Sequence, residues 1–105
     1  MNIPEIILKK VQVAMRLQAP EFQEYLRSLE KEARVYIKHF FIVEEVEEEV
    51  MKLCIDLHVQ YTLFSKIEYE SIAEDKLQTL HNIIRSFNES YEKKNPVKRG
   101  GVTFI

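Results

Sequence analysis

The chain has 105 residues and a formal net charge of −2, and 46% of its residues are hydrophobic and 30% charged, as in one ordinary globular domain. These values argue against wholesale disorder, and the short apolar runs argue against a membrane span, which needs about 20 apolar residues. The balanced charge creates no overall field toward nucleic acid or membrane. Abundant Lys, Glu and Ile indicate an AT-rich genome, in a bacterium, a phage or an archaeon.

A first helix is expected from Asn2 to just before Pro20. Asn2 and Glu5 have the spacing of a capping box, with Pro4 in the first turn, and a residue that precedes proline is pushed out of the helical region. The polar side chains form one narrow stripe: Glu5, Lys9, Gln12 and Arg16. Apolar residues cover the rest, about twice the apolar surface that one packed face needs.

A second helix should begin near Pro20 and Glu21. It has the most regular amphipathic pattern in the chain, because apolar residues recur at helical spacing opposite charged ones. The apolar face is Phe22, Tyr25, Leu26, Leu29, Ala33, Tyr36, Ile37 and Phe40. A short break is expected between Phe41 and Glu44, and one continuous long helix is the alternative, because residues 21–95 contain neither glycine nor proline.

The third helix should start among Glu44, Glu45, Glu47, Glu48 and Glu49, since negative charge is favoured at a helix N-terminus. Two apolar stripes run along it. The first is Val46, Val50, Leu53, Leu57, Tyr61 and Phe64, and the second is Met51, Ile55, Val59 and Leu63. Two stripes mean that this helix is packed on two sides, either as the central helix of the domain or within an oligomer.

A fourth helix is expected from about Ile72 to Lys94. Ser71 and Glu74 have capping-box spacing, and the Asn95-Pro96 pair ends the helix. Its inward face is Ile72, Leu77, Leu80, Ile83, Ile84, Phe87 and Tyr91. The preceding segment, residues 66–70, alternates in polarity, so it is either extended or a helical linker.

No set of residues identifies a chemistry. Cys54 and His58 lie four apart on one helical face and would supply half of a zinc site, but no second pair accompanies them. The two glycines, Gly100 and Gly101, lie in the tail, whereas phosphate-binding loops need glycines between a strand and a helix. The glutamate cluster is either a solvated helix start or a site for a cation or a basic partner. We therefore expect no enzyme activity, no catalytic residue, no cofactor and no metal.

The C-terminal tail combines a basic run with an apolar end. Lys98 and Arg99, with the lysines before them, would give charge-driven, nonspecific contact with nucleic acid. Phe104 and Ile105 follow Thr103 in a pattern similar to peptides whose free carboxylate PDZ domains bind. The alternative is that Phe104 and Ile105 fold back onto the bundle or pair with a neighbouring chain.

Together these elements predict an all-α fold, a compact three- to four-helix bundle in residues 1–95 with a basic, extended and flexible tail in residues 96–105. We expect a cytoplasmic protein, because there is one cysteine and no secretory signal. Excess apolar surface predicts a homodimer or a complex with another protein. The interface residues expected are Ile6, Ile7, Val13, Leu17, Met51, Ile55 and Val59. The function expected is a non-enzymatic protein-binding module, a small regulator, adaptor or inhibitor; a structural or nucleic-acid-associated subunit is the alternative, and membrane binding is not expected.

Overall fold

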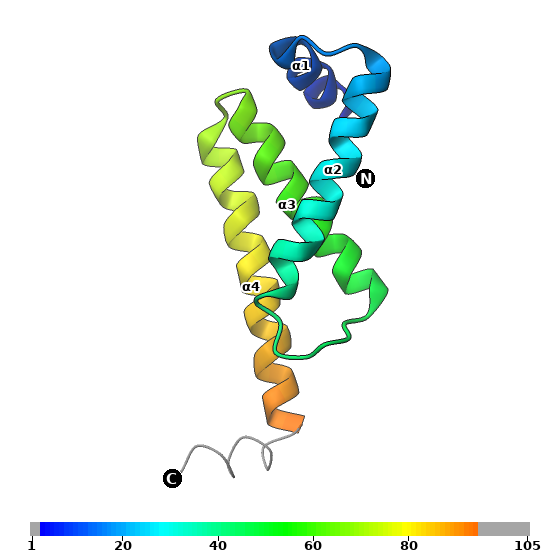
Figure 1. The fold of residues 1–105 in the computed structure, drawn as a ribbon. Coiled ribbons are helices and arrows are strands. Elements are labelled where there is room, and N and C mark those ends of the chain that lie inside the picture. Colours follow the sequence, from blue (N-terminus) through cyan, green and yellow to red (C-terminus); the bar gives the residue numbers. More distant parts are fainter. Residues whose placement is uncertain (1–2, 95–105) are drawn as a thin grey trace.

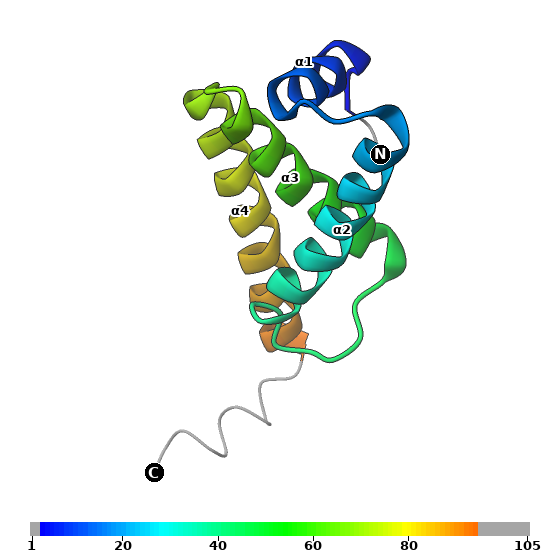
Figure 2. The same cartoon turned by 45° about the horizontal axis from the view of Figure 1, so that its top comes forward.

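The computed structural model describes residues 3–94, which form an all-α bundle, as predicted. Its helices are α1 (Glu5–Met15), α2 (Ala19–Lys38), α3 (Glu48–Lys66) and α4 (Glu70–Lys94). In Figure 1, α4 runs antiparallel beside α3, and α2 crosses α3. The turned view in Figure 2 shows α1 lying across the end of the bundle where α3 ends and α4 begins.

The central helix is α3, which packs against α4, α2 and α1. The second of its apolar stripes is buried within one chain, and the first is covered at least in part except at Leu53, which is 50% exposed. This packing supports the first of the two alternatives, a central helix of the domain. Leu63 and Val59 are fully buried, and Met51 and Ile55 nearly so. Ile7 and Val11 of α1 and Ile37 of α2 extend the same core.

Within residues 3–94, no helix has the length and apolar character needed to cross a membrane.

The helix ends differ in part from the sequence predictions. The N-terminal residue Asn2 lies outside the described residues, and α1 begins at Glu5 after Pro4. At the start of α2, the Gln18 N–H donates to the Glu21 carboxylate at 3.2 Å, a cap that the sequence analysis missed. The predicted cap at Ser71 is wrong. Helix α4 begins at Glu70, one residue before Ser71, so Ser71 lies inside its first turn.

The turn between α3 and α4 explains that shift. It is neither extended nor helical: Glu68 adopts the left-handed conformation, with φ 65°, and reverses the chain within three residues. The Tyr69 N–H then donates to the Phe64 carbonyl at 2.9 Å, and the Glu68 N–H to the Ser65 carbonyl at 3.3 Å. This is the hydrogen-bond pattern that commonly ends helices, usually with glycine at the left-handed position.

Helices α2 and α3 are separate, and the break between them, residues 39–47, is longer than expected. Contacts with α4 fix the position of this segment. The Asn88 side chain of α4 donates to the Phe40 carbonyl at 2.8 Å and accepts from the Ile42 N–H at 3.1 Å. Phe41, between them, is buried, with its ring edge-on to that of Phe87 at 5.1 Å. We call residues 39–47 the acidic connector, because Glu44, Glu45 and Glu47 lie in it.

Candidate protein-interaction surface

The structure places the predicted interface residues in three different environments. Ile6 and Val13 are at the surface, 65% and 74% exposed. Leu17 is half-buried and packs against the core. The remaining four are buried: Ile7, Met51, Ile55 and Val59. The prediction that these four face a partner is wrong, because the other helices of the same chain already cover them.

The exposed group lies on one side of α1. Ile7 and Val11 point into the core and fix the helix, so the residues on its other side face outward. Ile6 and Val13 are seven residues apart and therefore lie nearly above one another, two turns apart. They form a shallow depression of about 370 Å³ together with Lys9, Lys10 and Ala14. We call these five residues the α1 outer face.

Two features hold this surface in place. The Lys10 ammonium donates to the Tyr69 hydroxyl at 3.1 Å and lies 5.5 Å from the centre of the Tyr69 ring. Arg16 adopts the left-handed conformation, and its N–H donates to the Val13 carbonyl at 3.1 Å, which ends α1 directly after the outer face. The face is therefore a fixed surface on a short, well-terminated helix. Sequence analysis placed Lys9 in a polar stripe and did not associate either lysine with the interface.

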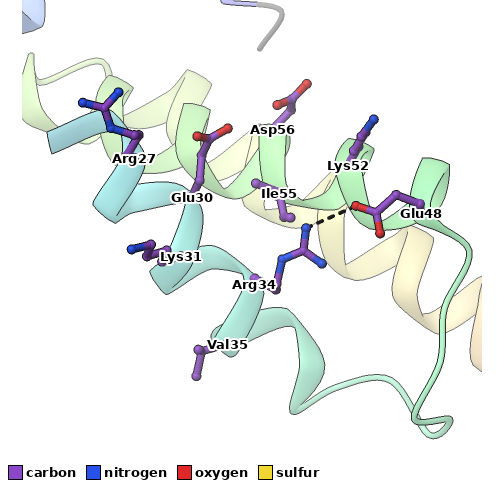
Figure 3. A pocket seen from close by; sticks show the side chains of 9 residues that line it. All are labelled: Arg27, Glu30, Lys31, Arg34, Val35, Glu48, Lys52, Ile55 and Asp56. Atoms are coloured by element: carbon purple, nitrogen blue, oxygen red, sulfur yellow. Dashed lines mark hydrogen bonds and ion pairs between the residues drawn. The ribbon is translucent and has the colours of Figure 1, made fainter. Parts of the chain in front are cut away.

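A second hollow, of about 700 Å³, lies between α2 and α3 (Figure 3). Its lining carries charges of both signs, and Arg34 reaches across to Glu48 at 3.2 Å. In Figure 3, Ile55 points toward α2 while Val35 points away from α3. The other lining residues are Arg27, Glu30, Lys31, Lys52 and Asp56. Opposite charges alternate at helical spacing, which is typical of a solvated surface with many weak ion pairs and gives no selection for one class of ligand.

Cys54 and His58, the pair with zinc-ligand spacing, lie on α3 in the part of the chain that the structure describes. Burial raises the pKa of the Cys54 thiol to about 11, which favours its protonated form at neutral pH. His58 and His81 both contact Tyr36, with ring centroids 4.5 Å and 5.9 Å from that of Tyr36, and the Tyr36 hydroxyl and His81 Nε2 are hydrogen-bonded at 2.9 Å. Among residues 3–94, no three His, Cys, Asp or Glu side chains come together in a group that could hold a metal ion.

The predicted tail residues Lys98, Arg99, Phe104 and Ile105 lie outside the described residues. Comparison with protein-family models, with curated proteins and with solved structures finds no match for this chain. The α1 outer face is thus the predicted interface that remains at the surface.

Proposed function

We propose that this protein is a non-enzymatic protein-binding module, a small helical regulator, adaptor or inhibitor of a bacterial, phage or archaeal cell, which occupies a surface of a larger protein with its α1 outer face. A cytoplasmic location and a homodimer form belong to the same proposal. The observation that carries it is the exposure of Ile6 and Val13, at 65% and 74%, on a helix whose other side is fixed in the core.

Physical chemistry supports this assignment. Exposed aliphatic side chains on a fixed helix bind a partner at little ordering cost, because the helix does not have to fold on binding. Burying about 100 Å² of apolar surface in such a contact contributes about 2.5 kcal/mol. The flanking Lys9 and Lys10 add charges at the rim, which favour partner choice and encounter rate over raw affinity.

The proposal is tested by affinity capture with the full-length protein from a lysate of its source or host, at moderate salt. We expect one stoichiometric protein partner. The double variant Ile6→Glu, Val13→Glu should lose this partner, because charged side chains would be buried in the contact. The matched control is Val35→Glu, since Val35 is similarly exposed, at 61%, but lies on α2.

Retention of the partner by the double variant, or loss of it by the control, would overturn the assignment of α1. Recovery of nucleic acid that dissociates at higher salt would instead favour the nucleic-acid-associated alternative. Circular dichroism of each variant separates loss of binding from loss of fold.

A further inference from the structure

The acidic connector is a second place where apolar side chains are exposed. Phe40 and Ile42 are 42% and 49% exposed, although Phe41 between them is buried. A hollow of about 380 Å³ lies beside Ile42, lined also by Lys38, Phe41, Val43, Glu44, Val46 and Met51. Phe40 lines another hollow, beside His81 and Asn88 of α4, so the exposed apolar side chain at the first hollow is Ile42.

The two surfaces carry opposite charge. Glu44, Glu45 and Glu47 of the connector are exposed, and they form no ion pair within residues 3–94, where Arg34–Glu48 is the one pair found. On the α1 outer face, Lys9 likewise has no acidic partner in this range, and Lys10 contacts the uncharged Tyr69 hydroxyl. Each surface thus lacks the charge that the other supplies.

One chain cannot bring these surfaces together. They lie at opposite ends of α2, with α1 at the top and the connector near the bottom of Figure 1. The 20 residues of α2 separate them by about 30 Å, since a helix rises about 1.5 Å per residue. The complementary surface must therefore come from another molecule.

From this complementarity we infer that the α1 outer face of one copy binds the acidic connector of a second copy. The inference rests on the proposed use of α1 as a binding surface: a second copy occupies this face in the homodimer, and the larger protein competes with it for the same residues. Ile6 and Val13 pack against Ile42 and Val43 of the second copy, which line one hollow, and Lys9 and Lys10 meet Glu44 and the neighbouring Glu45. Two antiparallel copies that make this contact twice form a closed, two-fold symmetric pair, whereas copies that make it once each in a row form an open head-to-tail chain.

The test is a charge exchange, followed by sedimentation equilibrium of the purified full chain at low salt. We expect concentration-dependent association of the unchanged protein. The variant Lys9→Glu, Lys10→Glu and the variant Glu44→Lys, Glu45→Lys should each associate about tenfold more weakly, because like charges then oppose one another. An equimolar mixture of the two variants should recover the association, since each then meets opposite charge.

The control is Lys31→Glu, Lys52→Glu, which makes the same charge change in the α2–α3 groove and should leave association unchanged. Lys9→Glu alone serves as a second variant if loss of the Lys10 contact with Tyr69 unfolds α1. A protein that stays monomeric near about 1 mM, or variants whose mixture does not recover, would overturn the inference. If the unchanged protein is monomeric while the Ile6 and Val13 variant still loses its captured partner, only this inference fails and the proposed function stands.

Discussion

The hydroxyl groups of two tyrosines of α2 differ in hydrogen bonding. The Tyr36 hydroxyl is hydrogen-bonded to His81 Nε2, whereas the Tyr25 hydroxyl is buried and has no hydrogen-bond partner among residues 3–94. Burial raises the pKa of Tyr25, and the charge of Glu32 raises it further. A buried polar group without a partner loses its hydration and gains nothing in return.

This contrast predicts opposite effects of the same substitution. Tyr25→Phe should raise the free energy of unfolding by up to about 1 kcal/mol, because it removes a hydroxyl that is desolvated without compensation. Tyr36→Phe should lower it by about 1 kcal/mol, because it removes a made hydrogen bond. Urea unfolding followed by circular dichroism measures both. A loss of stability in Tyr25→Phe equal to that in Tyr36→Phe would contradict the assignment.

At the scale of the helices, two of the helix ends among residues 3–94 place a residue other than glycine in the left-handed conformation. Arg16 ends α1 with φ 57°, and Glu68 follows α3 with φ 65°, a conformation that costs a residue with a Cβ atom roughly 1–2 kcal/mol. The surrounding hydrogen bonds, such as Tyr69 N–H to the Phe64 carbonyl, hold this conformation. At each of these two positions the left-handed backbone destabilises the folded chain, and glycine would remove this destabilisation.

Glu68→Gly should accordingly stabilise the protein. The gain expected is about 0.5–1 kcal/mol, the relief of the left-handed conformation less the larger backbone entropy that glycine loses on folding. Glu68→Ala is the matched control and should change stability by less than about 0.5 kcal/mol, since alanine keeps the Cβ atom. Thermal and urea unfolding check both variants. An alanine variant as stable as the glycine variant would mean that side-chain charge, not backbone conformation, sets the effect.

The same helix ends show what the sequence could predict. The amphipathic periods of α2 and α3 are local, so the helices and most of their inward faces were predictable, including the packing of α3 on two sides. The predictions that Phe40 and Ile72 face inward are wrong, because both are exposed. The length of the connector was not, because it depends on Asn88, which lies more than 40 positions away and bonds to Phe40 and Ile42. The start of α4 was also missed, because Glu68 carries no sequence signal for a left-handed turn.

The candidate surface was predictable only in part, for a related reason. Excess apolar surface on the first helix followed from its pattern, and Ile6 and Val13 are exposed. The pattern could not say which stripe of α3 the other helices cover, so Met51 and Val59 were assigned to an interface although they are core residues. Burial of a side chain depends on the packing of the whole chain, which a helical period does not contain.

For the molecule as a whole, three helices meet at Tyr36. Its ring lies 4.5 Å from that of His58 on α3, and its hydroxyl bonds to His81 on α4. His58 also contacts the ring of Tyr61, at 5.7 Å. Burial lowers the pKa of His58 below the ordinary 6.5; the charge of Glu32 opposes this shift and that of His81 adds to it. A group that joins three helices and resists protonation couples the stability of the bundle to pH.

The sign of that coupling follows from proton binding. As the pH falls through about 6.5, the unfolded chain protonates His58 before the folded chain does, so the free energy of unfolding should fall between pH 7.5 and pH 5.5. Urea unfolding across this range measures the slope. His58→Gln should flatten it, because glutamine does not titrate. The matched control is His39→Gln, at an exposed histidine of the connector. A slope that survives His58→Gln would place the acid sensitivity in other groups and would show that protonating His58 does not weaken the contact among α2, α3 and α4.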